Sequence, residues 1–213
     1  MALADKQGRN PNENMATNTW VSTPEDAKSI ETHEIYAHAG LALYLAQCLE
    51  HEIVNSLGLA EIVRIWKTNR PQSADELAAY RTRVDEIWDE NYEHTLGQLL
   101  NLLRKSNIAI PVNLDSLLRE SLQVRNRLVH EYFRERAKDW FESDGRRMMA
   151  NELENMQALF KKTDHTLHEV TAKIRNAFGM TEDKVKLVGE LMKANASEED
   201  IDRAISKSFG EVK

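Results

Sequence analysis

The chain has 213 residues, of which 41% are hydrophobic and 30% are charged, and its formal net charge is −7. This composition can bury a core and excludes a wholly disordered chain, and the negative charge disfavours nonspecific coating of nucleic acid without excluding a local basic site. Only 8 Gly and 4 Pro are present, which favours long helices over a turn-rich β fold. Because Cys48 is the single cysteine, an internal disulfide is excluded. With neither a leader nor a run of about 20 apolar residues, the sequence predicts a soluble cytoplasmic protein that does not cross a membrane.

The N-terminal quarter of the chain divides into a polar stretch and a helical one. Residues 1–22 lack a hydrophobic period, and we interpret them as a flexible N-terminal arm. Thr23 is typical of an N-cap and is followed by Pro and two acids, which predicts a long helix over 24–57. We expect Gly58 to break that helix and a shorter helix to follow over about 59–68.

Capping residues mark the starts of the next three helices. Ser73 and Thr95 are expected N-caps, each followed by an apolar period of 3.6 residues. The run at 107–112 contains Pro and is expected to be a loop. Asn113 is a plausible N-cap for a helix over 114–138.

The last third of the chain predicts one long helix and two short ones. The long helix should begin after Ser143, run over about 146–178 and end at Gly179. Thr181 and Ser197 are the expected caps of the two short terminal helices. We find no repeat and no credible strand. The expected domains are the arm at 1–22, a helical bundle of four to five main helices at 23–178, and short helices at 179–213.

Two charged residues fall on apolar helix faces. Arg125 lies near the middle of the apolar stripe of helix 114–138, and Glu50 lies on the stripe of the first long helix. Because an unpaired buried charge is very costly, we expect the two side chains to pair. The pair could only fix the register of the helices, or Glu50 could orient Arg125 towards a site. The first helix also carries a second stripe of leucines, which could face another helix of the bundle or a subunit interface: Leu41, Leu45 and Leu49.

A short stretch of helix 114–138 carries groups suited to phosphodiester chemistry. Residues 125–132 read Arg-Asn-Arg-Leu-Val-His-Glu-Tyr, and Asn126 and His130 are neighbours at i,i+4. Cleavage of RNA needs a base for the ribose 2′-hydroxyl and a cation for the charge that develops on phosphorus. Imidazole titrates near neutral pH and could serve as base or acid. From spacing alone, a lone helical histidine such as His130 is more often an ordinary core or surface residue.

This stretch resembles the signature of the HEPN superfamily. Arg125, His130 and Tyr132 match R-x4-H-x-Y, and Asn126 supplies the polar residue that often follows the Arg. The surrounding VRNRLVHEYFRER is similar to the motif helix of bacterial HEPN-like proteins, and TLGQLLNLL and AQCLEHEI also look like that branch. The resemblance covers roughly 30–178.

The resemblance implies an all-α bundle that dimerises, so that two motifs form one composite cleft. Active relatives are metal-independent endoribonucleases that leave a 2′,3′-cyclic phosphate, and several act as toxins or in phage defence. The expected partners are therefore RNA, a second copy of the chain, and an antitoxin or other protein. No cofactor and no metal are expected. Other relatives are non-catalytic binding modules, which is the alternative function. The resemblance implies that Arg125 stabilises the phosphate, that Asn126 orients the phosphate or the imidazole, and that His130 is the base or the acid. Glu50 would hold Arg125, and Tyr132 would line the cleft. In relatives with a nucleotidyltransferase antitoxin, the position of Tyr132 is the one that is modified.

The motif lies in a locally basic region. Residues 119–147 contain eight Lys or Arg against six Asp or Glu, a charge of +2 in a chain of −7. We expect Arg127, Arg134 and Arg136 to bind RNA. A solvated face of mixed charge is the alternative.

Two further pairs of residues leave alternatives open. Trp140 and Phe141 could stack a base or cover the end of the core. His165 and His168 could bind a metal, but two such ligands on one helix face are usually only surface residues.

Overall fold

The computed structural model describes residues 26–69, 71–177, 179 and 181–209, and within these residues all regular structure is helical. The all-α prediction is therefore confirmed, while the expected arm at 1–22 and the Thr23 cap lie outside the described residues. The helices in chain order are α1 (Ala27–Thr68), α2 (Ala74–Tyr92), α3 (Leu96–Lys105), α4 (Val112–His130), α5 (Tyr132–Glu135), the 3-10 turn η1 (Asp139–Phe141), α6 (Ser143–Ala177), α7 (Glu182–Lys193) and α8 (Glu198–Phe209).

Helix α1 runs without interruption for 42 residues, so the predicted break at Gly58 is wrong. Its N-cap is Asp26, whose carboxylate accepts a hydrogen bond from the Ser29 amide at 2.8 Å. A Cβ at Gly58 would lie 3.0 Å from ring atoms of Trp88 in α2. Gly58 therefore allows α2 to pack closely on α1, and the packing outweighs the weak helix propensity of glycine.

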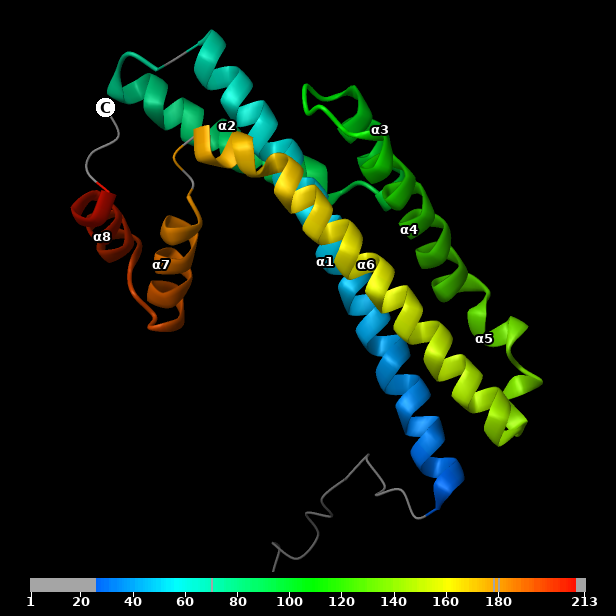
Figure 1. Cartoon of the computed structure of the whole chain (residues 1–213). Helices are drawn as coiled ribbons and strands as arrows, with labels where there is room; N and C mark the ends of the chain where they lie inside the picture. The colour runs from blue at the N-terminus through cyan, green and yellow to red at the C-terminus, as the bar shows by residue number, and fades with distance from the viewer. Residues whose placement is uncertain (1–25, 70, 178, 180, 210–213) are drawn as a thin grey trace, which may run out of the picture.

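The two longest helices, α1 and α6, form the axis of the molecule and lie side by side (Figure 1). Glu31 near the start of α1 accepts hydrogen bonds from Ser143 at 2.5 Å and Arg146 at 2.8 Å, both at the start of α6. Glu52 of α1 pairs with Arg175 near the end of α6 at 3.3 Å. The contacts advance in the same direction on both helices, so α1 and α6 are parallel.

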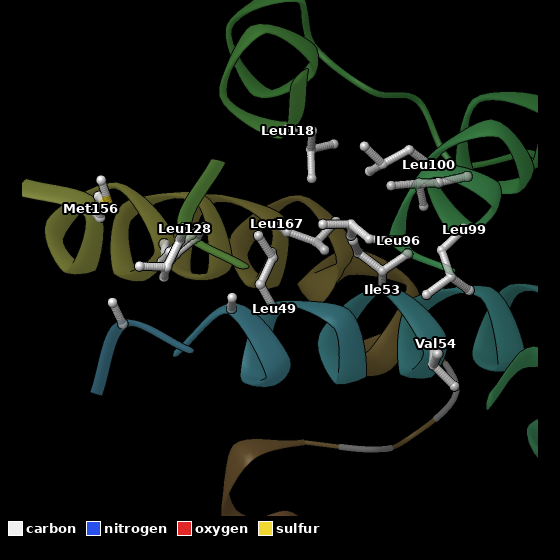
Figure 2. Packing of buried hydrophobic residues seen from close by; sticks show 14 of the residues in the cluster. Leu49, Ile53, Val54, Leu96, Leu99, Leu100, Leu118, Leu128, Met156 and Leu167 are labelled. Carbon is white, nitrogen blue, oxygen red and sulfur yellow. The ribbon is translucent and has the colours of Figure 1, made fainter. Parts of the chain in front are cut away.

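The core lies where α3 and α4 pack against this helix pair. Figure 2 shows Leu49 and Ile53 of α1 in the space where Leu96 of α3 and Leu167 of α6 also converge. Leu49 is fully buried and Leu45 packs against the core, so only Leu41 of the predicted second leucine stripe is exposed. Ser121 of α4 and Thr163 of α6 share a buried hydrogen bond of 3.0 Å.

The predicted caps of α2 and α3 are confirmed. The Ser73 hydroxyl accepts from the Glu76 amide, and Thr95 and Gln98 form a reciprocal capping box. The loop before α4 is also confirmed, but the N-cap of α4 is Pro111 and not Asn113.

The prediction of one continuous helix over 114–138 is wrong beyond His130, where α4 ends. Glu131 leaves the helical region with φ −129° and ψ −33°, and the chain resumes as the single turn α5. Two contacts with α6 account for the change of direction. The Tyr132 hydroxyl donates to the Met149 carbonyl at 2.9 Å, and Arg136 donates from Nε to Glu152 at 2.8 Å.

Helices α7 and α8 pack against each other beside the far end of α6 (Figure 1). Gly179 precedes them with φ 71°, a left-handed conformation that suits glycine at a helix end. The Ser197 hydroxyl accepts from the Asp200 amide at 3.2 Å, as expected of a cap. Over the described residues, no helix combines the length and apolar character that a membrane span needs.

Candidate functional site

The ion pair predicted between α1 and α4 is present. Arg125 Nε lies 3.3 Å from Glu50 Oε1, and both side chains are partly buried rather than enclosed. Arg125 also donates from a terminal guanidinium nitrogen to Asn126 Oδ1 at 3.3 Å. Two contacts therefore hold the guanidinium at the edge of the α1/α4 packing, where part of it still faces solvent.

The other polar residues of the motif lie on the outer side of α4. Asn126 and His130 are both exposed, one helical turn apart, and His130 is the last residue of α4. The Arg125 guanidinium reaches Asn126, and Asn126 lies one turn from His130, so the three residues span two adjacent sides of α4, which together we call the motif face. It offers a fixed cation, an amide and a titratable imidazole to a ligand from solvent.

Tyr132 does not lie on the motif face. Its side chain is completely buried, and its hydroxyl is bonded to the Met149 carbonyl. Burial, followed by the charge of nearby Glu152, raises the pKa of the Tyr132 phenol. Arg127 lies over the Tyr132 ring, 5.4 Å from its centroid. The expectation that Tyr132 lines a cleft is therefore wrong, because its side chain packs in the core and bonds to α6.

The expected RNA-binding arginines differ in availability. Arg127 pairs with Glu135 at 2.8 Å, and Arg136 is held by Glu152. Arg134 is exposed, and no ion pair involves it within the described part of the chain. Most of the positive charge near the motif is therefore already neutralised by acids of the same chain.

An aromatic cluster that the sequence analysis missed lies beyond the kink. The Tyr36 ring of α1 lies 5.4 Å from Trp140 and 6.3 Å from Phe133, and the Phe133 and Trp140 rings are 6.1 Å apart. Tyr36 and Phe133 are both exposed, whereas Trp140 packs against the core. Trp140 therefore covers the end of the core, which was one of the two alternatives for this residue. Phe141 instead points into solvent. No sequence signal joins Tyr36 to Phe133, which lie on different helices.

No metal centre is evident where the structure is described. Across 26–69, 71–177, 179 and 181–209, no three His, Cys, Asp or Glu side chains come together as a potential ligand set. His165 lies 3.3 Å from Glu169 on the surface, while His168 lies 3.4 Å from Glu52. The two histidines thus pair with different glutamates.

Comparison with known proteins leaves the family unassigned. No family model matches the chain, and neither the curated proteins nor the solved structures give a match.

Proposed function

We propose that this chain is a HEPN-like, metal-independent endoribonuclease that acts through a composite site in a homodimer. Arg125 stabilises negative charge on the scissile phosphate, and Asn126 orients the phosphate or the imidazole. His130 transfers the proton. Glu50 positions Arg125 without touching RNA.

One observation carries this proposal: a guanidinium held by Glu50 donates a hydrogen bond to Asn126, which lies one helical turn from the exposed His130. Arginine always carries its charge and can bind a phosphate through two donors, so a held guanidinium is ready for a developing phosphorane. A histidine imidazole can take the 2′-hydroxyl proton or protonate the leaving 5′-oxygen. The motif resemblance supports the same assignment.

The need for two copies follows from proton accounting. Attack by the 2′-oxygen requires a base, and departure of the 5′-oxygen requires an acid. Each motif face carries one imidazole, and a single His130 can hold only one of these roles at the start of the reaction. A second copy supplies the other His130, and this is the reason to propose a composite site.

A second candidate function is a non-catalytic module that binds a protein. The pairing of Arg127 and Arg136 with acids favours this candidate, because paired arginines contribute little to holding a phosphate backbone. The exposed Tyr36 and Phe133 also suit a protein partner.

The test is cleavage of labelled single-stranded and structured RNA by purified protein in excess EDTA. The parent should cut RNA, and His130→Ala should lose at least about a hundredfold in rate while unfolding like the parent. His165→Ala is the matched control, since His165 is an exposed helical histidine on α6, and it should cut normally. Equal cleavage by the parent and His130→Ala would assign the activity to another site or a contaminant. If no protein cuts any RNA, the binding module becomes the better account.

A further inference from the structure

The middle of α1 has an exposed side without charge. Residues 35–49 contain no Asp, Glu, Lys or Arg, in a chain where 30% of residues are charged. Seven of these residues are nevertheless exposed. A solvated helix face normally carries charges, so this one has the composition of a covered surface. The seven are Tyr36, Ala37, Gly40, Leu41, Leu43, Tyr44 and Gln47.

Four of these residues, at i, i+3, i+4 and i+7, share one stripe: Ala37, Gly40, Leu41 and Tyr44. We call this the α1 stripe. Leu41 is 41% exposed and Tyr44 is 61% exposed. Gly40 is unfavourable in the middle of a helix, and a Cβ built on it would meet nothing within 4 Å. Packing inside this chain explains Gly58 but does not explain Gly40, and a close approach from outside the chain would.

We infer that the α1 stripe is the surface through which two copies of this chain dimerise, with the two α1 helices antiparallel across a two-fold axis between Gly40 and Leu41. In that register, two residues from different copies face each other when their numbers add to 81. Gly40 of each copy then faces Leu41 of the other, and Ala37 faces Tyr44. Each large side chain meets a small one, so the stripe is complementary to itself.

Charge also favours a second copy as the occupant. Two copies with a net charge of −7 repel each other, and an interface between identical faces puts like charges close together unless the face is neutral. The α1 stripe is neutral over its whole length. A surface that binds a charged partner protein would carry residues of the opposite charge, and the α1 stripe contains no acid or base.

The symmetry connects this surface to the motif face, a step that rests on the proposed function. A two-fold axis that passes between antiparallel helices keeps the same flank of each copy on the same side of the dimer. Helix α4 lies along one flank of α1, joined to it by the Glu50–Arg125 pair. Both motif faces would therefore open on one side of the dimer, as a composite site requires.

The primary test is the mass of the protein in solution by light scattering, over a concentration series. The parent should be a dimer at micromolar concentration, and Leu41→Glu should raise the dissociation constant at least a hundredfold. Val112→Glu is the matched control, because Val112 is an apolar helical residue that is 85% exposed and lies outside the stripe. It should leave the dimer intact. A monomeric parent, or a Leu41→Glu protein that still dimerises like the parent, would overturn the inference.

A charge-rescue experiment tests the register. Ala37→Glu and Tyr44→Lys should each weaken the dimer, and the double variant should recover it. In the double variant, the introduced carboxylate of each copy would face the introduced ammonium of the other, so each dimer would contain two such pairs. Failure of the double variant to recover, while both single variants fold and dissociate, would overturn the antiparallel register. Circular dichroism confirms folding of each variant.

The two proposals can fail separately. A dimer that depends on Leu41 but cuts no RNA supports this inference and counts against the nuclease. A monomer that cuts RNA through His130 overturns both the α1 interface and the composite site. Binding of the parent to lipid vesicles, lost in Leu41→Glu, would identify a membrane surface as the occupant and also overturn the inference.

Discussion

The last third of α1 and the end of α4 depart from their sequence signals in opposite directions. At Gly58 the sequence indicates a break, and α1 continues. After His130 the sequence indicates a continuing helix, and α4 stops. In both places a neighbouring helix decides the outcome: Trp88 of α2 packs against Gly58, and Met149 of α6 accepts the hydrogen bond from Tyr132.

The difference shows what a local signal can and cannot determine. Glycine lowers helix propensity by about 1 kcal/mol, which close packing of an indole ring can offset. The segment after His130 has good helix formers, but Tyr132 and Arg136 bind it to Met149 and Glu152 of α6. Burial of one large aromatic side chain with its hydroxyl satisfied outweighs a few intrahelical hydrogen bonds.

The largest expected effect comes from removing the side chain that turns the chain at the end of α4. Tyr132→Ala leaves a cavity in the core and should lower the free energy of unfolding by about 3–5 kcal/mol. Tyr132→Phe keeps the ring and removes only the hydrogen bond to the Met149 carbonyl, so it should cost about 1 kcal/mol. Urea unfolding followed by circular dichroism measures both. A cost for Tyr132→Ala below about 1 kcal/mol would mean that this anchor does not set the kink.

The α1 side of the comparison can be tested by a double-mutant cycle. Gly58→Ala should give no stabilisation in the parent, because the new methyl group meets the Trp88 ring at 3.0 Å. In a Trp88→Ala background, the same change should stabilise by about 1 kcal/mol, the ordinary gain in helix propensity. Thermal or urea unfolding of the four proteins gives the coupling energy. If Gly58→Ala stabilises both backgrounds equally, the indole is not the reason for the glycine.

The Glu50–Arg125 pair should affect function more than stability. Both side chains are partly exposed, so Glu50→Gln should lower the free energy of unfolding by no more than about 1 kcal/mol. RNA cleavage should fall by about tenfold, since an unrestrained guanidinium is less well placed for the phosphate. Parallel measurement of unfolding and single-turnover cleavage separates the two effects. A large stability loss with unchanged cleavage would leave the pair with only the task of fixing helix register.

The smallest expected effect is the pH dependence of stability that comes from Glu52, where α1 packs against α6. Burial raises the pKa of Glu52 above its ordinary value of 4.5, although His168 and Arg175 oppose the shift and Asp164 adds to it. The folded state therefore binds the proton more tightly, so the parent loses stability as pH rises through the raised pKa of Glu52. Glu52→Gln lacks this loss, and its stability relative to the parent should improve from pH 4 to pH 7. Urea midpoints across that range provide the measurement, and a difference that stays flat with pH would contradict the assignment.

Much of the fold was predictable because its signals are local. Ser73 and Thr95 each cap their helix through a partner only three residues along the chain, and the loop before α4 is marked by its own proline. The Glu50–Arg125 pair was also predictable, because each charge interrupts an apolar stripe and burial leaves them few other partners.

The rest depends on contacts between distant segments, which a helical period does not contain. The kink after His130 depends on Met149 and Glu152 of α6, and the aromatic cluster joins Tyr36 to Phe133 across 97 positions of sequence. The pairing of Arg127 with Glu135 also requires the kink, since the two side chains are eight residues apart. These contacts change which motif residues are exposed.

The most direct test of the account compares cleavage by His130→Ala and Tyr132→Phe in the same assay with EDTA. His130 is exposed and Tyr132 is buried, although only one residue separates them. We predict that His130→Ala loses cleavage by at least about a hundredfold while keeping the stability of the parent. Tyr132→Phe should keep cleavage within about twofold while losing about 1 kcal/mol of stability. The reverse pattern, with full activity in His130→Ala and a folded but inactive Tyr132→Phe, would contradict the motif face as the site of the reaction.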